Sequence, residues 1–334
     1  MDKVNLGQNK KYEFDITITG DTYAGIQSLP YVSAAVKSPD TIAKGYVRTI
    51  DGLNSKAVIS NFASNNPIVS GGSSNCAFSS GNDTSTTEQV LTLTDLKVNE
   101  EICRATVFPT WFGQNMSRDG ELPQEFSEFL MGVVTAKAGA QIENGLWVAD
   151  ASSIMGAGFL SNDGVFDQLG LNASACADFT QVTMNGVGTA TTNANIDDAL
   201  AKVYDTVVGS HPGLIDKPGF GVYMNNKMYG FYGQFLMASG SGQGINMLGT
   251  NQSIDGLTYM GYPVYRCPGM PDDSIVMTYK DNLVVGTNAG TQYTEARLIP
   301  TYQYDGSDNV RITMNFALGV QTGVKTDGVV GVTF

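Results

Sequence analysis

The alternation of apolar and polar positions in the first hundred residues predicts a long pair of strands. Residues 47–50 and 57–60 alternate between apolar and polar side chains, and a turn signal at Asp51 and Gly52 separates them. After a tip rich in asparagine, serine and glycine, residues 90–98 resume the same alternation. A ribbon of two strands is only marginally stable in water, so we expect its apolar residues to rest on another subunit or on its own domain.

The clearest helix is predicted over residues 122–149, where Leu122 and Pro123 open a segment with apolar residues at steps of three and four. These apolar positions are Phe126, Phe129, Leu130, Val133, Val134, Ile142 and Leu146. A helix of this length spans roughly 40 Å. Gly132 and Gly139 each weaken it by about 1 kcal/mol relative to alanine, unless they allow close packing against a sheet.

The second half of the chain alternates helices with strands. Asn195 is expected to cap a helix over residues 196–208, with Asp197 and Asp198 in the first turn, where the helix dipole favours them. Another amphipathic helix is expected over residues 226–237. Strands are predicted over residues 221–224, 257–259, 263–267, 274–279, 282–286, 296–304 and 309–318. This order predicts the α+β class, with a mixed sheet and helices against it.

Two further segments lack regular patterns. Residues 1–45 are too interrupted by glycine and proline for a long helix and too apolar for a solvated tail, so this arm needs a surface on its own monomer or on a neighbour. Residues 151–195 are rich in glycine, asparagine and serine, with a strand signal at 179–184. We therefore expect this segment to connect two lobes.

Composition narrows the class of protein. The 334 residues are 42% hydrophobic, which predicts a folded chain with a sizeable core. The formal net charge is -13 with only 19 Lys and Arg residues, which argues against a general nucleic-acid binder. An acidic surface keeps a concentrated protein soluble, and in a container it would also keep the inner wall from holding nucleic acid.

The candidate chemistry is sparse. The four cysteines, Cys76, Cys103, Cys176 and Cys267, are far apart and form no C-x-x-C pair, so free thiols are expected. His211 is the only histidine, which excludes a catalytic triad or a multi-histidine metal site unless His211 itself serves. No apolar run predicts an export signal or a membrane span. We predict no catalytic residue, cofactor or metal, and no enzymatic activity.

The order of the predicted parts, an arm, a hairpin, a long helix, a link and an inserted lobe, resembles that of a known protein family. Three segments support this resemblance. These are LTLTDLKVNEEICRATVFPTWFG at residues 91–113, GLTYMGYPVYRCPGMPDDSIVMTYKDNLVVGTNAG at residues 256–290 and NVRITMNFALGVQTG at residues 309–323. They resemble the strand leading to the spine helix, the lobe at the capsomer axis and the closing strand of the Hong Kong 97 fold. The chain thus resembles the major capsid proteins of tailed bacteriophages.

The resemblance implies an architecture and partners. It implies an N-terminal arm at 1–45, an extended hairpin loop at 46–89, a peripheral domain at 90–195 and 296–334, and an axial domain at 196–295. It implies hexamers and pentamers that close into an icosahedral head around double-stranded DNA, which is enclosed without specific binding. A portal and scaffolding or decoration proteins are the further partners, and the location is the virion, assembled in the host cytoplasm. If Met1 is the genuine start, scaffolding comes from a separate protein or is unnecessary.

Two segments are predicted to make assembly contacts. The hairpin tip that overlaps a neighbour is assigned to Asn65, Asn66, Pro67, Ile68 and Val69. The turn that faces the capsomer axis is assigned to Pro268, Gly269, Met270, Pro271, Asp272 and Asp273. Some relatives join subunits covalently through a hairpin lysine, and Lys56 is the lysine nearest the tip, although no partner amide is identified.

Two other interpretations stay open at this point. The resemblance fits equally an encapsulin-type cellular shell, which has the same fold. A β-rich adhesin or tail protein that binds carbohydrate is favoured by the 15 Tyr and 2 Trp residues. The helices at 122–149 and 196–208 count against a purely β-structured protein.

Overall fold

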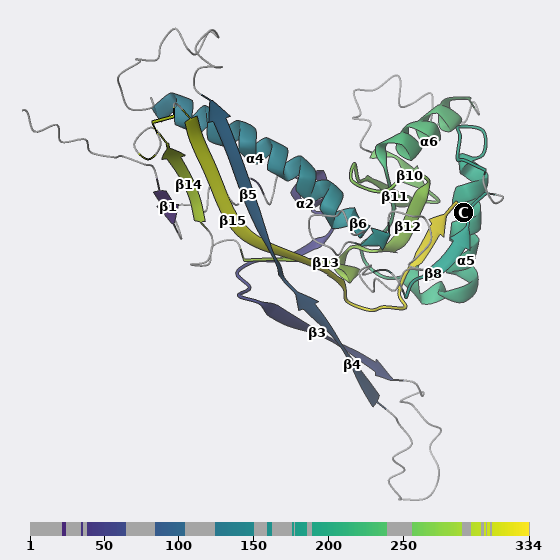
Figure 1. Ribbon diagram of the computed structural model, residues 1–334. Helices are drawn as coiled ribbons and strands as arrows, with labels where there is room; N and C mark the ends of the chain where they lie inside the picture. Colours follow the sequence, from purple (N-terminus) through teal and green to yellow (C-terminus); the bar gives the residue numbers. More distant parts are fainter. Residues whose placement is uncertain are drawn as a thin grey trace, which may run out of the picture.

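The protein is described here by a computed structural model of the whole chain. It describes residues 22–24, 35, 39–64, 84–103, 124–149, 159–161, 176, 178–185, 189–238, 256–288, 295–301, 304, 306, 307 and 309–333. These residues form two lobes, each with its own sheet, and a hairpin that projects away from both (Figure 1). The arrangement separates a packed body from an extended element.

The first sheet is covered by the long helix α4 (Gln124–Trp147). Its strands follow the order β1 (Thr22–Ala24), β14 (Glu295–Pro300), β15 (Asn309–Thr322), β13 (Leu283–Thr287) and β2 (Arg48–Ile50), and β5 (Thr94–Cys103) also pairs with β15. Leu130, Val134 and Ile142 of α4 share one core with the alternate residues Ile312 and Met314 of β15. This period-two burial explains why β15 forms a strand with one face on the helix.

The second sheet lies in the other lobe, against the helices α5 (Ile196–Ser210) and α6 (Asn226–Ala238). Its strand order is β10 (Thr258–Tyr259), β11 (Tyr262–Arg266), β9 (Phe220–Met224), β12 (Ser274–Tyr279), β16 (Val329–Val332) and β8 (Thr180–Thr183). A Cβ atom on Gly331 would lie 2.4 Å from the Val203 side chain. The glycine therefore lets α5 pack closely on β16.

The projecting hairpin consists of β3 (Lys56–Ser64) and β4 (Thr84–Thr92), which among the described strands pair only with each other (Figure 1). The short elements α2 (Asp40–Ala43), β6 (Val148–Ala149), β7 (Leu160–Ser161), η3 (Pro212–Leu214) and η5 (Lys280–Asn282) complete the described structure. The predicted α+β class, the long helix and the two later helices are confirmed. A two-stranded hairpin is also present, with different bounds: residues 57–60 and 90–92 belong to it, and β4 begins at Thr84, within the predicted tip. The predicted strand at 47–50 instead pairs with β13, and residues 94–98 belong to β5.

Three local predictions about the helices need correction. Asn195 does not cap α5 with its side chain, because its Oδ1 accepts a hydrogen bond from the backbone N–H of Thr192 at 2.6 Å. Val133, predicted on the apolar face of α4, is 37% exposed. Gly132 faces open space, so it does not mark a close approach to the sheet.

The strand pairing also crosses the predicted domain boundaries at three places. Strand β13, predicted with the axial part, pairs with β15 and β2 in the first sheet. Strands β8 and β16, predicted with the peripheral part, pair with each other in the second sheet. The chain therefore passes between the sheets more often than a single inserted lobe requires. The division into a peripheral and an axial domain stays a prediction.

Candidate assembly site

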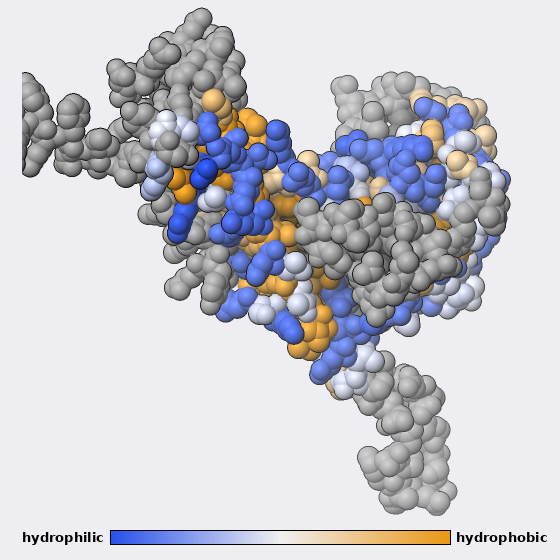
Figure 2. Space-filling model, in the orientation of Figure 1, coloured by the Kyte–Doolittle hydropathy of each residue, from blue (hydrophilic) through white to orange (hydrophobic). Residues whose placement is uncertain are grey.

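One face of the hairpin presents apolar side chains to water. Val58 and Val90 lie directly opposite each other in the register, and Phe62 lies on the same face because it is four residues beyond Val58. These side chains are 61%, 47% and 75% exposed, respectively. Hydrophobic surface is visible where the hairpin leaves the body (Figure 2). An exposed apolar row on a two-stranded ribbon is a candidate contact with another molecule.

The opposite face of the hairpin is anchored to the body. Leu91 is completely buried, and a Cβ atom on Gly286 would lie 2.5 Å from its Cδ2 atom. A Cβ atom on Gly319 would lie 2.2 Å from the carbonyl oxygen of Thr92. Both glycines thus allow β4 to cross the first sheet at close range. The base of the hairpin is held firmly, so its exposed face points in a defined direction.

The structure describes one of the two predicted contact segments. Residues 65–69 lie outside the described residues. The turn at 268–273 lies where the second lobe meets α4: the N–H of Gly269 donates to Oε1 of Glu143 at 3.4 Å, and Met270 is only 4% exposed. Asp272 of the same turn is exposed and accepts a hydrogen bond from Nδ2 of Asn225 at 2.6 Å. Its contact with another subunit stays a prediction.

Glu143 connects three parts of the chain. Its carboxylate accepts hydrogen bonds from the N–H of Thr41 at 3.1 Å and from Oγ1 of Thr41 at 2.5 Å, besides the one from Gly269. The indole N–H of Trp147 donates to Oγ1 of Thr41 at 3.0 Å. Burial raises the pKa of Glu143, although the hydrogen bonds from Thr41 and Gly269 act to lower it. This buried cluster joins α2, α4 and the turn of the second lobe.

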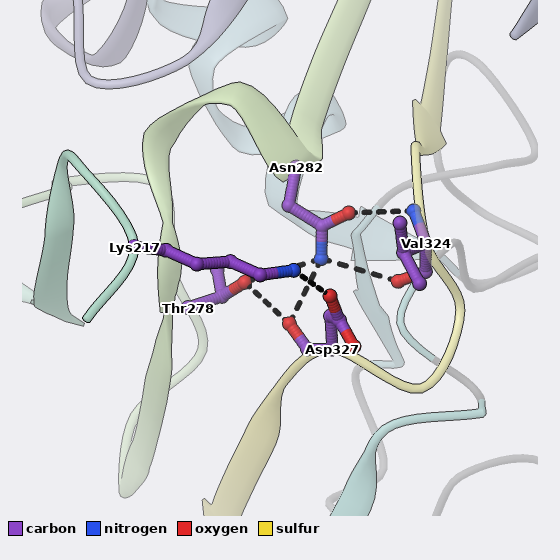
Figure 3. A network of polar contacts seen from close by, with 5 residues as sticks. All are labelled: Lys217, Thr278, Asn282, Val324 and Asp327. Carbon is purple, nitrogen blue, oxygen red and sulfur yellow. Dashed lines mark hydrogen bonds and ion pairs between the residues drawn. The ribbon is translucent and has the colours of Figure 1, made fainter. Parts of the chain in front are cut away.

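A second polar cluster joins two segments in which the chain passes from one sheet to the other, residues 280–282 and residues 323–328 (Figure 3). The buried amide of Asn282 donates to the carbonyl oxygens of Val324 at 3.2 Å and Asp327 at 2.9 Å, and it accepts from the N–H of Val324 at 2.7 Å. Oγ1 of Thr278 also donates to the carbonyl of Asp327 at 2.7 Å. Lys217 forms an ion pair with the side chain of Asp327. These bonds fix residues 323–328 to the end of β12.

The sequence did not single out either cluster. Glu143 sits beside Ile142 and Leu146 on the apolar side of a helix, and a carboxylate at such a position is the signal that could have found it. Asn282 was predicted as the first residue of the strand over 282–286, whereas it is the last residue of η5, in a turn of the kind where asparagine is common for local reasons. Its long-range partners depend on how the two sheets meet.

The structure shows the surroundings of the candidate reactive side chains His211, Cys176, Cys267 and Lys56. Nε2 of His211 lies 2.8 Å from Oγ1 of Thr180. Burial raises the pKa of the thiols of Cys176 and Cys267, so both are protonated at neutral pH. Lys56 is the first residue of β3 and pairs in register with Thr92, at the base of the hairpin; its covalent role stays a prediction.

Among the described residues, no group of three or more His, Cys, Asp or Glu side chains could hold a metal ion. No helix in the same residues is long and apolar enough to cross a membrane.

Comparison with known proteins gives matches by structure alone. No protein-family model and no curated sequence matches the chain. The capsid of the native GTA particle matches with a TM-score of 0.56 and 14% identity, over 90% of each chain. The capsid of Myoviridae phage XM1 matches with a TM-score of 0.54 and 10% identity, over 88% of this chain and 92% of that chain. Mycobacterium phage Che8 matches with a TM-score of 0.50 and 12% identity, over 98% and 96%.

The fold is therefore that of shell-forming capsid proteins. More particularly, it is the Hong Kong 97 fold of tailed bacteriophages, with its long helix, extended hairpin and two lobes. The predicted resemblance is confirmed at the level of the fold, over nearly the whole chain.

Proposed function

We propose that this chain is a major capsid protein of a tailed bacteriophage, a structural subunit without enzymatic activity. The observation that carries the proposal is the anchored hairpin, which leaves Val58, Phe62 and Val90 exposed on a ribbon of two strands. Burying this row against a neighbouring copy supplies a hydrophobic contact that the single chain lacks. Its function is association with itself.

The geometry favours a closed ring of copies. The hairpin projects from the body (Figure 1), so a neighbouring copy would receive it on a surface other than its own hairpin. Such a contact is heterologous, and heterologous contacts close into rings when the rotation between copies allows it. Hexamers and pentamers of this kind form an icosahedral head, in which many modest contacts add up through multivalency.

The remaining partners follow from this role. The first-sheet lobe is assigned to the peripheral part of the capsomer and the second-sheet lobe to the part near its axis. The chain acts with a portal and with scaffolding or decoration proteins, and it encloses double-stranded DNA in the virion after assembly in the host cytoplasm. The net charge of -13 suits an inner wall that encloses DNA without holding it.

Expression of the chain alone, followed by negative-stain electron microscopy and light scattering, tests the proposal. Closed shells, rings or tubes are the expected products, with or without an added scaffolding protein. Shells that package double-stranded DNA in phage-infected cells support the viral role, whereas shells that enclose a cellular protein indicate an encapsulin. A chain that stays monomeric with every scaffolding protein tried, and that binds carbohydrate, would overturn the proposal in favour of an adhesin.

A further inference from the structure

Helix α2 is a single short turn that lies beside α4, where α4 meets the second lobe (Figure 1). Thr41 of α2 is completely buried, and its N–H and hydroxyl groups both donate to the carboxylate of Glu143 on α4. The N–H of Gly269, in the turn of the second lobe, donates to the same carboxylate. Because Glu143 is only 5% exposed, three elements of the chain meet at one buried acidic side chain.

The chain is anchored on both sides of α2. Ala35 before it and Val47 after it are buried in the core of the first lobe. The carbonyl of Tyr46 accepts a hydrogen bond from the hydroxyl of Tyr223 at 2.8 Å. Residues 39–46 therefore form a strap that is fixed to the body on either side, with α2 in its middle.

Gly45 ends α2 and is the point at which the strap can bend. Its N–H donates to the carbonyl of Ile42 at 2.9 Å, and the N–H of Tyr46 donates to the carbonyl of Thr41 at 3.0 Å, which is a Schellman motif. This motif needs a left-handed residue, and Gly45 has a φ of 64°. A helix of four residues is not stable by itself, so the closed position of α2 depends on the contacts of Thr41.

The contact between Thr41 and Glu143 serves either form of the carboxyl group. The two oxygen atoms, Oγ1 and Oε1, are 2.5 Å apart. An ionised carboxylate accepts the hydroxyl proton of Thr41. A protonated carboxyl group donates to Oγ1 of Thr41 instead, and the hydroxyl then turns to the thiol of Cys267, its other hydrogen-bond partner. The protonated form thus keeps these groups paired without burying a charge.

Burial decides which form the closed site prefers. Burial raises the pKa of Glu143, the hydrogen bonds that the carboxylate accepts lower it, and the negative charge of Asp40 raises it further. Among the described residues, the titratable groups facing the site are Asp40 and Lys44 on the strap and Cys267 after β11. Lys44 lies 4.0 Å from Asp40. The net effect is a raised pKa, so the closed site favours the protonated carboxyl group.

We propose that the protonated carboxyl group of Glu143 holds the strap, residues 39–46, closed over the joint between α4 and the second lobe, and that loss of this proton to water releases the strap. A buried carboxylate lacks the hydration that it has in water, and opening of the strap restores this hydration. The device belongs to the single chain and goes beyond the proposed function. It makes the joint between the lobes firmer in acid and looser as the pH rises.

The pH dependence of the strap follows from proton linkage. In the open form Glu143 is exposed and has its ordinary pKa of 4.5, whereas in the closed form the pKa is raised. The ratio of open to closed molecules therefore rises by up to about ten-fold for each pH unit between these two pKa values, and it levels off above them. The contribution of the closed site is complete below the ordinary pKa and is lost as the pH rises through the raised one.

Hydrogen exchange of the full chain, measured by mass spectrometry, tests the strap. Peptides that contain the N–H groups of Thr41, Gly45 and Tyr46 are followed from about pH 4 to about pH 8, and each rate is divided by that of Glu143→Gln at the same pH. The division removes the pH dependence of the exchange chemistry, and glutamine keeps the shape of the side chain without ionising. We expect the ratio to rise by at least about five-fold over this range. A ratio that stays constant would overturn the proposal.

Two further variants separate the strap from a general loosening of the chain. Glu100→Gln changes an exposed carboxyl group on β5 and should follow the unmodified chain. Gly45→Ala puts a side chain at a left-handed position, where its Cβ atom would meet Nζ of Lys280 at an ordinary distance of 3.5 Å, so the cost lies in the backbone. It should speed exchange in the strap by about five-fold or more at every pH and leave the pH dependence unchanged. Unchanged exchange in Gly45→Ala would show that α2 is not the part that moves.

The location of the change separates local from global opening. Faster exchange confined to the strap and to residues 267–270 supports the proposal, whereas an equal rise in α5, within the core of the second lobe, means global unfolding and overturns it. Labelling of Cys267 gives a second measure, because this thiol is completely buried beside Thr41. Its labelling rate relative to Glu143→Gln should rise over the same pH range, and a constant relative rate would contradict the strap. The proposed function is tested by assembly, so either proposal can fail without the other.

Discussion

Phe62→Thr tests whether the exposed hairpin face is a contact between subunits. The side chain is 75% exposed, so the single chain loses little when it is shortened, and threonine keeps the preference of the position for a strand. Surface substitutions of this kind change the free energy of unfolding by less than about 0.5 kcal/mol. Any larger effect must therefore come from association.

The size of the expected effect follows from the exposed area. A fully enclosed phenylalanine buries about 200 Å², and three quarters of that area, at about 25 cal/mol per Å², is worth roughly 4 kcal/mol. Threonine retains part of this contact, and an interface covers a side chain incompletely, which leaves about 2 kcal/mol per hairpin. Since about 1.4 kcal/mol corresponds to a factor of ten, the assembly threshold should rise roughly 30-fold.

The assay is light scattering over a concentration series, with thermal unfolding of the unassembled chain measured in parallel. Tyr304→Thr is the matched control, because Tyr304 is 72% exposed and lies outside the hairpin. We expect its threshold to stay within about three-fold of the unmodified chain, as for an ordinary surface position. Assembly of Phe62→Thr at the unmodified threshold, or an equal loss for Tyr304→Thr, would refute the reasoning.

Three other substitutions test the anchoring of the hairpin and the two polar clusters around Glu143 and Asn282. Leu91→Ala should lower the free energy of unfolding in urea by about 2 to 5 kcal/mol, and its exposed neighbour Val90→Ala by less than about 1 kcal/mol; equal losses would contradict the buried anchor. Asn282→Ala should cost about 2 to 4 kcal/mol and speed hydrogen exchange at 323–328, measured by mass spectrometry, because backbone groups there lose their partner; unchanged exchange would count against it. The folded-state pKa of Glu143 is raised, so its stabilising contribution is complete below its ordinary value of 4.5 and is lost as pH rises through the folded pKa. Glu143→Gln should flatten this fall in unfolding free energy between about pH 4 and pH 7, and parallel curves for the two proteins would argue against the assignment.

The elements with a strong period were predictable from the sequence. Residues 124–147 form a helix because their apolar residues recur every three or four positions, and β15 forms a strand because its apolar residues alternate. The hairpin was predictable because two alternating segments, at 57–60 and from residue 90 onward, lie on either side of a polar tip. The same pattern predicted that its apolar residues rest on another subunit or on its own domain, since two strands cannot stabilise themselves. Leu91 rests on the body of its own chain, and the contact with another subunit stays a prediction.

The two polar clusters around Glu143 and Asn282 were not predictable, because the side chains that form each cluster are far apart in the sequence. Thr41 and Glu143 are 102 positions apart, and Asn282 and Val324 are 42 apart, so no local pattern relates them. The same reason explains why the pairing of β8 with β16 was not predicted: their sequences are local, and only the packing around α5 decides that they pair with each other. The prediction that the Asn195 side chain caps α5 was wrong, because its Oδ1 accepts a hydrogen bond from the N–H of Thr192 and not from the first turn of the helix.

The sequence by itself determined the elements of this protein, their order, its acidic charge and the resemblance to a capsid fold, because period, turn chemistry and composition are local properties. Only the tertiary structure decided which strands share a sheet and which hairpin face stays exposed. These features depend on contacts between residues that are distant along the chain. Burial and hydrogen-bond satisfaction in three dimensions, rather than local preference, select among such contacts.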